Sequence, residues 1–389
     1  MTTTDRVLVA SNRGPVWFAD EDGELSPRRG SGGLVAALAS AVQTTGGLWV
    51  SAAMGPGDRR RAAETPDGRM EVVVDDTKFG IRLLAFDPKT YDRAYNQVSN
   101  RILWFVHHRL WDLPRSPIFD TESRAAWEAY RRFSRSFAEA LAQEVGALPA
   151  TVLVQDYHLA LVPAFLRAMA PQVRIAHFSH VPFADPDTLR LLPGPLWREL
   201  LTGMLGADLL GFHTERWADA FLACCRGLEE TSVRGRTITR EGRTSRVGVF
   251  PISIEAEGLR ARAGSELVRH RRKELVRWRR DRALVLRVDR LDPSKNILRG
   301  FLAFEDLLRR RPGWRGRVVF LALLNPSRQG VPEYRAYAQE CLAAAGRING
   351  ELGDRGWQPI DVRVNDDIDE VLAAYALYNV LMVNPVFDG

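Results

Sequence analysis

Short apolar runs alternate with amphipathic stretches along almost the whole chain. The apolar runs are near-continuous, which is typical of strands that are buried on both faces of a parallel sheet. The stretches between them have the hydrophobic spacing of helices that cover such sheets. The pattern therefore predicts an α/β fold with parallel sheets.

The expected elements follow one another regularly. The expected strands are Val7–Ser11, Leu48–Ala52, Ile81–Phe86, Thr151–Gln155, Arg174–Phe178, Leu209–Phe212, Arg246–Phe250, Ala283–Val288, Arg317–Leu323, Ile360–Val364 and Val380–Val383. The expected helices are Gly33–Val42, Glu122–Glu144, Leu161–Met169, Pro195–Leu205, Glu215–Leu228, Glu266–Arg279, Asn296–Arg310, Glu333–Ala345 and Asp367–Tyr378.

The alternation is interrupted once, by the polar segment Thr237–Gly248, which has the pattern of a hairpin. A charged segment follows, and a strand–helix pattern starts afresh at Ala283. We therefore expect a domain boundary near residue 250, with domains over residues 1–250 and 251–389. Each is a plausible size for a domain with its own core.

The chain ends shortly after its last expected strand. Only Phe387, Asp388 and Gly389 follow the apolar segment Leu381–Val386, so no helix covers that strand. Three or four expected strands are also few for an open doubly wound sheet. We therefore expect the second domain to be truncated.

The composition is typical of a globular protein and argues against a membrane-spanning or secreted one. The chain has 389 residues, 46% of them hydrophobic and 26% charged, which is ordinary for a globular protein. It lacks a run of about eighteen apolar residues that could cross a membrane. The polar N-terminus lacks the basic start and apolar core of a signal peptide. Cys224, Cys225 and Cys341 fit neither a disulfide framework nor a metal site, so they indicate a reduced, cytoplasmic protein.

The net charge of +6 comes mostly from arginine. A basic surface suits polyanions or phosphorylated small molecules, and it is equally the pattern of a plain solvated surface. Because no basic stripe carries interleaved aromatic residues, nucleic acid is not an expected partner.

Polar residues follow the first expected strand, and glycines lie further on. The strand ends in Ser11-Asn12-Arg13, and a long loop leads from Pro15 to Gly30-Ser31-Gly32-Gly33 at the start of a helix. Backbone N–H groups at a helix start can hold a phosphate, although the same glycines also suit a plain loop-to-helix joint. The spacing fits neither the dinucleotide-binding nor the Walker fingerprint.

Aromatic residues gather in the segment Tyr95–Phe105. Tyr95 and Trp104 could wall a sugar pocket, because ring faces stack on pyranoses while the O–H and N–H groups bind hydroxyls. A buried helix with aromatic packing explains the same pattern, so both interpretations stay open.

Two further strands end in polar residues. Gln155-Asp156-Tyr157-His158 follows one strand, and His177–His180 ends the next. Buried polar groups need fixed partners or a ligand. Two histidines suggest zinc, but no third ligand has suitable spacing, so we expect no metal.

Basic residues follow two strands of the second domain. Arg290 and Lys295 come after the first strand, and Arg328 comes after the next. Ser294 or Asn296 could cap the helix that begins there. Three basic residues at the ends of neighbouring strands suit a diphosphate.

These stretches together resemble one known family. The motifs SNR, GGL, YNxxSNxxLW, QDYHL, HxPF, GFHT, RLDxSK and a late DG occur in this order over the whole chain. The combination is similar to the trehalose-6-phosphate synthase family, whose members are glycosyltransferases. The resemblance implies the GT-B architecture, in which two Rossmann-like, doubly wound parallel-sheet domains face a cleft.

The resemblance also assigns roles to particular residues. For the glucose-6-phosphate acceptor site it implies Arg13, Tyr95, Trp104, Asp156 and Arg328, with the family aromatic Trp49 nearby. Gly33 matches the glycine that approaches the donor diphosphate, and Arg290 and Lys295 match the pair that neutralises it. His180 and Asp388 match residues that hold the hydroxyls of the donor glucose. Catalysis is implied for His180, Asp388, Arg290 and Lys295.

The implied reaction moves glucose from UDP-glucose or GDP-glucose to glucose-6-phosphate, giving trehalose 6-phosphate with retention of configuration. The family assigns no carboxylate nucleophile, so a front-side substitution without cofactor or metal is expected. Nothing in the sequence separates UDP from GDP, and a homo-oligomer stays open.

Three alternatives share the family fold: a validoxylamine-type pseudoglycosyltransferase, a glucosylglycerol-phosphate synthase and a non-catalytic sugar-phosphate sensor. The full acceptor motif argues against the first. The family glutamate that binds the donor ribose follows the late DG motif and is absent from these 389 residues. We therefore expect weak or no turnover from this form.

Overall fold

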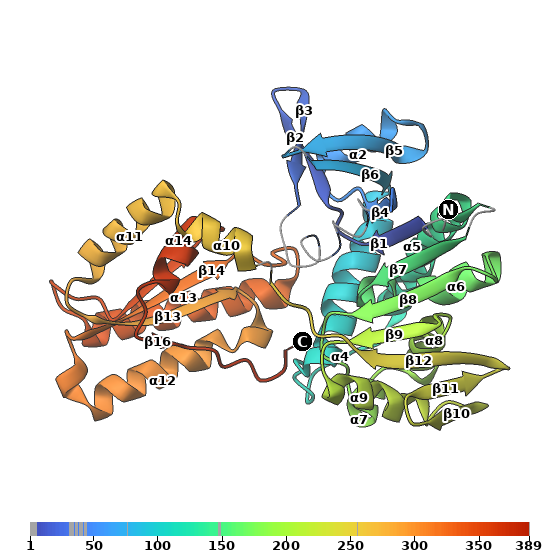
Figure 1. Cartoon of the computed structure of the whole chain (residues 1–389). Helices are drawn as coiled ribbons and strands as arrows, with labels where there is room; N and C mark the ends of the chain where they lie inside the picture. Colours follow the sequence, from blue (N-terminus) through green and yellow to red (C-terminus); the bar gives the residue numbers. More distant parts are fainter. Residues whose placement is uncertain are drawn as a thin grey trace. The chain divides into compact units, whose positions relative to one another are not determined.

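The computed structural model describes residues 6–30, 35, 38, 42, 45–75, 77–146, 149–254 and 256–388. The chain divides into two compact units, the first ending at Ile254 and the second at Asp388. Each unit has its own sheet and its own helices (Figure 1).

The first unit is built on one large sheet. Within the described residues, ten strands pair in the order β10-β11-β12-β9-β8-β7-β1-β4-β6-β5. The strands from β12 to β6 are parallel, and β10, β11 and β5 pair antiparallel at the two edges. The bounds are β1 Arg6–Ser11, β4 Leu48–Ala52, β5 Arg69–Val74, β6 Thr77–Leu84, β7 Ala150–Gln155, β8 Arg174–Ser179, β9 Leu209–Phe212, β10 Thr231–Arg234, β11 Thr237–Arg240 and β12 Arg243–Val249.

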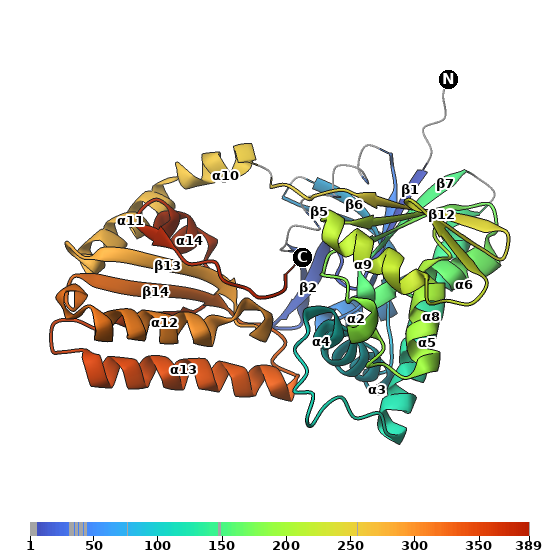
Figure 2. The same ribbon diagram turned by 90° about the horizontal axis from the view of Figure 1, so that it is seen from below.

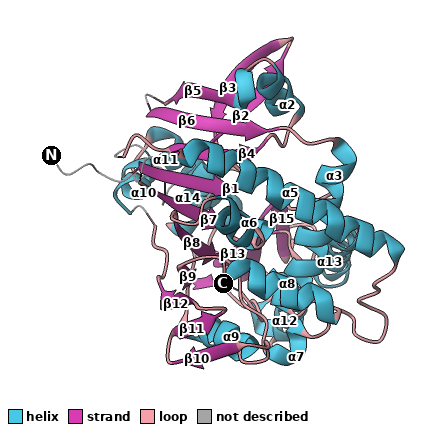
Figure 3. Ribbon diagram, turned by 90° about the vertical axis from the view of Figure 1, so that its right-hand side faces the viewer, coloured by secondary structure: helices cyan, strands magenta, loops and turns pink. Residues whose placement is uncertain are grey.

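The long helix α5, Thr121–Val145, shows how the helices of this unit form. The Asp120 carboxylate accepts the Ser123 amide at 2.9 Å and so caps the first turn. Trp127, Tyr130 and Phe133 recur at helical spacing and are fully buried. α5 packs against α6, Val162–Met169, which packs against α8, Gly194–Met204 (Figure 3).

Further helices of the first unit are α2 Pro56–Ala63, α3 Pro88–Asp92, α4 Trp104–His108, α7 Pro186–Leu189 and α9 Glu215–Cys225. A π-helix, Arg93–Leu103, joins α3 to α4. The Ser99 hydroxyl donates to the Ala94 carbonyl at 2.9 Å within it. Because π-helices are rare and concentrate at functional sites, this segment is a candidate for more than packing.

The expected loop between Pro15 and Gly30 is wrong. Strands β2, Val16–Glu21, and β3, Glu24–Arg29, form an antiparallel hairpin there. Asp22 and Gly23 turn the chain with φ of 53° and 86°. An Asp-Gly pair of this kind is a strong hairpin signal, and the buried Val16 and Phe18 alternate with exposed Trp17. The sequence thus carried the signal that the loop interpretation overlooked.

The second unit has a smaller parallel sheet. Four strands pair in the order β15-β14-β13-β16 among its described residues. They are β13 Ala283–Arg290, β14 Val318–Asn325, β15 Ile360–Val364 and β16 Val380–Leu381. The helices are α10 Ala256–Ala263, α11 Glu266–Arg279, α12 Ile297–Arg310, α13 Pro332–Leu352 and α14 Ile368–Tyr375.

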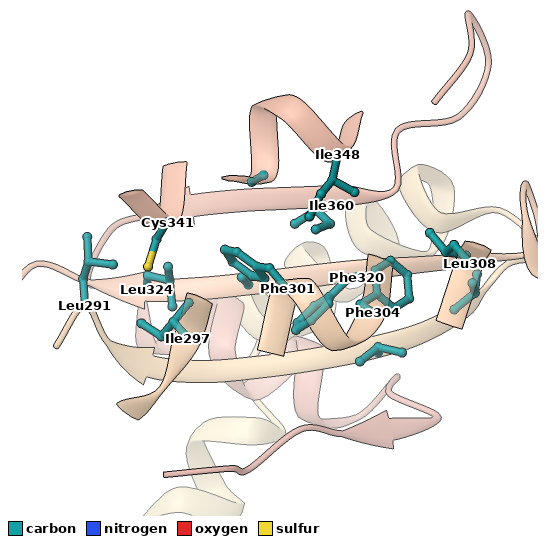
Figure 4. Packing of buried hydrophobic residues seen from close by; sticks show 14 of the residues in the cluster. Leu291, Ile297, Phe301, Phe304, Leu308, Phe320, Leu324, Cys341, Ile348 and Ile360 are labelled. Atoms are coloured by element: carbon teal, nitrogen blue, oxygen red, sulfur yellow. The ribbon is translucent and has the colours of Figure 1, made fainter. Parts of the chain in front are cut away.

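Helices cover both faces of this sheet. α12 and α13 lie on one side of β13 and β14, and α11 and α14 lie on the other (Figure 2). On the first side Phe320 of β14 meets Phe301 and Phe304 of α12 edge to face, at centroid distances of 5.4 and 5.3 Å. Figure 4 shows these rings between the helices and the strands. Alternate residues of β13 and β14 therefore fill two separate apolar layers.

The expected α/β architecture with parallel sheets is confirmed, and each expected strand is present with small shifts at its ends. The hairpin expected in Thr237–Gly248 is formed by β11 and β12. The expected helix Gly33–Val42 lies mostly outside the described residues. The search of the described helices found none with the length and apolar content that a membrane span needs.

Removing the central ring of the second core should destabilise the protein. We expect Phe320→Ala to lower the free energy of unfolding by about 3–5 kcal/mol, because it removes buried contacts and leaves a cavity. Denaturant unfolding measures this. Leu302→Ala on the exposed side of α12 is the control, with an expected loss below about 1 kcal/mol. Equal losses in the two variants would contradict the packing described here.

Candidate active site at the ends of the parallel strands

In the first sheet the strand order reverses beside β1, which lies between β4 and β7. Ligands of open α/β sheets bind at the carboxyl ends of strands at such a reversal. The loop after β1 carries Asn12 and Arg13, and the loop after β7 carries Asp156. The structure therefore brings two of the expected acceptor residues to one reversal point.

Arg13 is exposed on a loop that is fixed by hydrogen bonds from Ser11 and Trp49. The Ser11 hydroxyl donates to the Arg13 carbonyl at 2.6 Å and accepts the Trp49 indole N–H at 2.7 Å. Trp49 is fully buried, and its hydrogen bond to Ser11 helps to fix this loop. Arg13 also lines a cavity of about 220 Å³ with Trp17 and Asp58.

A row of rings connects the two loops. The Asn12 side-chain N–H donates to the Tyr91 hydroxyl at 3.2 Å. Tyr91 stacks on Tyr95 at 5.3 Å, and Tyr95 stacks on His158 at 5.6 Å. Tyr95 is half-buried, so part of its ring is accessible next to His158, which lies two residues after Asp156.

Trp104 lies deeper than Tyr95. It is 3% exposed and packs on Tyr157 at 5.9 Å and on His108 at 3.8 Å. Trp104 is therefore largely buried among aromatic rings, whereas Tyr95 is partly accessible.

Asp156 ties the ends of β7 and β8 together. Its backbone has a φ of 70° and a ψ of 169°, a strained conformation that is almost confined to glycine and that clusters at active sites when other residues adopt it. Its carboxylate accepts the His180 amide at 3.1 Å and lies 3.7 Å from the His158 ring. Its carbonyl accepts a hydrogen bond from the His177 ring at 3.2 Å.

The two histidines of β8 and the following loop are neutral at neutral pH. Burial lowers the pKa of His180 to about 4, and burial lowers the pKa of His177 to about 4 as well. The His180 ring contacts the Gln155 amide oxygen at 2.9 Å. His180 also borders an apolar cavity of about 210 Å³ with Phe178 and Phe250. A neutral imidazole in this setting is suited to hydrogen bonds with hydroxyl groups.

In the second sheet the strand order reverses between β13 and β16. Arg290 ends β13 and is exposed, and Lys295 lies on the helical turn that follows. Asp388 comes from the segment after β16, and its carboxylate forms an ion pair with the Lys295 ammonium group. Three of the expected donor residues thus gather at this reversal point.

A buried carboxylate, which the sequence analysis missed, organises the neighbouring cations. Asp292 is fully buried, and its carboxylate accepts the Ser294 amide at 2.9 Å, the Arg328 guanidinium at 2.8 Å and the Tyr334 hydroxyl at 3.1 Å. Arg290 lies 3.9 Å from the same group. Burial by itself raises the pKa of Asp292, but Arg328, Arg290 and the bonds from Ser294 outweigh it, so the pKa lies below its usual value.

This arrangement places Arg328 beside Arg290, on the tips of the neighbouring strands β14 and β13. The signal for Asp292 was its position two residues before Ser294, where a carboxylate can cap the turn. Gly33 lies outside the described residues. Among the described residues no group of three or more histidine, cysteine, aspartate or glutamate side chains could hold a metal ion.

Two α/β units, each with polar and charged residues where its parallel sheet reverses, match the GT-B class of glycosyltransferases, to which the similar solved structures belong. Residues 5–389 match the family model of glycosyltransferase family 20, and the chain belongs to that family. It is accordingly a hexosyltransferase.

The chain is similar to curated proteins of known activity. It is 34% identical to alpha,alpha-trehalose-phosphate synthase [UDP-forming] 1 of Aspergillus fumigatus, over 99% of this chain and 73% of the relative. It is 35% identical to trehalose-6-phosphate synthase of Mycobacterium sp. (strain JLS), over 98% of this chain and 77% of the relative.

Solved structures agree with this likeness. A trehalose-6-phosphate protein from E. coli bound with UDP-2-fluoro glucose superposes with a TM-score of 0.84 at 29% identity, covering 99% of this chain and 79% of that one. The UDP-forming synthase of Burkholderia xenovorans in complex with glucose-6-phosphate gives a TM-score of 0.81 at 27% identity, covering 99% and 80%.

Acidification should destabilise the first unit through His177. Its pKa is about 4 in the folded protein against an ordinary 6.5, so the unfolded chain takes up a proton first as the pH falls. The contribution of neutral His177 to the free energy of unfolding is therefore fully present above pH 6.5, and it decreases as the pH falls from 6.5 towards 4. The loss approaches about 1.4 kcal/mol per pH unit for this group.

Urea unfolding at several pH values between 7 and 5 would measure this effect. His177→Gln keeps a donor for the Asp156 carbonyl and cannot be protonated, so its stability should fall less steeply than that of the wild type. Parallel pH profiles would show that His177 does not titrate as its burial implies.

Proposed function

We propose that this chain transfers glucose from UDP-glucose to glucose-6-phosphate, with retention of configuration, and so forms trehalose 6-phosphate. The observation that carries the proposal is the group of cations at the tips of β13 and β14, in a chain similar over its whole length to trehalose-phosphate synthases. GDP-glucose is the alternative donor to be compared.

The acceptor is assigned to residues around the first reversal point and to Arg328. Arg13 and Arg328 bind the phosphate of glucose-6-phosphate, and guanidinium groups suit that role because they present paired donors. Tyr95 stacks beside the sugar and Asp156 binds its hydroxyls. Trp104 shapes this wall by supporting Tyr157.

The donor is assigned to the second reversal point together with His180 and Gly33. Arg290 and Lys295 bind the diphosphate, and Gly33 approaches it through its backbone. His180 and Asp388 bind the hydroxyls of the donor glucose. Neutral His180 supports this role, because an uncharged ring can accept as well as donate.

The chemistry follows from charge. When the bond between the glucose C1 and the diphosphate oxygen breaks, negative charge develops on the leaving UDP, and Arg290 and Lys295 stabilise it. The acceptor hydroxyl oxygen forms the new bond to C1 on the same face. Its proton passes to the departing phosphate oxygen, so no enzyme nucleophile is required.

The proposed location is the cytoplasm, where sugar nucleotides and glucose-6-phosphate are available. The three cysteines support it, because all three are buried and free of disulfides.

Release of UDP or GDP in the presence and absence of glucose-6-phosphate tests the proposal. We would follow formation of the disaccharide product with radiolabelled donor, which detects small amounts of product. Formation of labelled trehalose 6-phosphate from UDP-glucose is the expected result. Transfer only to a different acceptor, or binding of glucose-6-phosphate without transfer, would favour one of the alternative activities.

The charge of Lys295 should be needed for the chemical step. We expect Lys295→Met to lower kcat by roughly 10²–10³-fold, because the positive charge that meets the leaving diphosphate is lost. Lys273→Met on the exposed side of α11 removes the same charge elsewhere in the unit and should leave kcat unchanged. Equal activities of the two variants would argue against the role of Lys295.

A further inference from the structure

The second unit holds a buried charge that the proposed mechanism does not use. Arg287, within β13, is 0% exposed and is one of the largest fully buried side chains of the described residues. Removing a guanidinium group from water costs several kcal/mol, and only well-placed partners offset that cost. The hydrogen-bond partners of Arg287 therefore indicate its structural role.

Those partners lie on two different segments. One guanidinium nitrogen donates to the Lys295 carbonyl at 3.1 Å and lies 3.6 Å from the Asp289 carboxylate. The other donates to the side-chain oxygen of Asn384. Lys295 belongs to the loop after β13, and Asn384 belongs to the segment after β16.

A second pair of contacts joins the same two segments. The Asn296 side-chain N–H donates to the Asn384 carbonyl at 2.9 Å, and the Asn384 side-chain N–H donates to the Asn296 carbonyl at 3.3 Å. Asn296 adopts a φ of 56°, a conformation that asparagine tolerates better than most residues. The loop and the segment are thus bound to each other directly and through Arg287.

The surrounding helix leaves room for the guanidinium group. Gly300 lies in the first turns of α12, and a Cβ atom there would lie 2.9 Å from the Met382 sulfur and 3.5 Å from Arg287 Nη2. Any larger residue would push the guanidinium group or the segment after β16. Burial also lowers the pKa of Arg287, and burial raises the pKa of Asp289 beside it.

We propose that Arg287 is a positioning residue for the sugar-nucleotide donor. It binds the loop after β13 to the segment after β16 from inside the unit, and this holds Lys295 and Asp388 at the site where the donor's diphosphate and glucose arrive. The inference rests on the proposed function for the identity of the donor. Arg287 itself touches no substrate.

The planar guanidinium group explains the choice of arginine. It presents donors in several directions from one rigid plane, so it reaches both segments at once, whereas a lysine ammonium group is a single point of charge. An apolar side chain would fill the space but would leave the Lys295 carbonyl and the Asn384 amide without this donor.

Arg287→Met should loosen both segments. We expect faster hydrogen exchange at residues 295–297 and 382–388, and UDP binding weaker by roughly tenfold in calorimetry, because Lys295 is no longer held in place at the diphosphate site. KM for glucose-6-phosphate should change little, and Arg287→Lys should lie between Arg287→Met and the wild type. The matched control is Arg310→Met, which removes an exposed arginine of α12 and should change none of these values.

The outcomes separate this inference from the proposed function. Unchanged hydrogen exchange in folded Arg287→Met overturns the inference, even if UDP binding is weaker. The lost charge alone would then explain the weaker binding. If circular dichroism shows that Arg287→Met does not fold, Asn384→Ala removes the same link and is judged by the same measurements. A wild type that binds no UDP contradicts the proposed function, while the exchange comparison still tests the positioning.

Discussion

In each unit the strand order reverses once beside the first strand of the sheet, and this reversal decides where polar groups can lie. The central strands, such as β1, β4 and β14, are buried on both faces and are apolar along most of their length. At a reversal, the loops after two neighbouring strands leave in opposite directions and open a space at their carboxyl ends. Arg13 and Asp156 lie at one such place, and Lys295 and Asp388 lie at the other.

The charges at the second reversal are held by partners rather than left to solvent. Asp292 fixes Arg328 beside Arg290, and Asp388 pairs with Lys295. Burying Asp292 and Arg287 is costly, and each is retained with several hydrogen bonds. The positions of Arg290, Arg328 and Lys295 therefore depend on contacts with two buried charged groups, Asp292 and Arg287.

Much of this could be predicted from the sequence, because strand ends are local features. The apolar runs located the strands, and the polar residues directly after them, such as Asp156 and Arg290, were recognised without a structure. Asp292 and Arg287 were not, because their importance depends on contacts with residues as distant along the chain as Arg328 and Asn384. The depth of a side chain is also not local, so nothing in the sequence separated buried Trp104 from half-buried Tyr95.

The ion pair between Lys295 and Asp388 links the two residues that the proposal assigns to opposite ends of the donor. Under the proposed roles, one of these residues binds the diphosphate and the other binds the glucose of the same donor. When the donor binds, it therefore separates the pair. Its diphosphate becomes the partner of Lys295, and its glucose becomes the partner of Asp388. A ligand that offers only a phosphate or only a sugar would replace one partner of this pair and leave the other residue without a counterpart, so the pair favours a ligand that carries both groups.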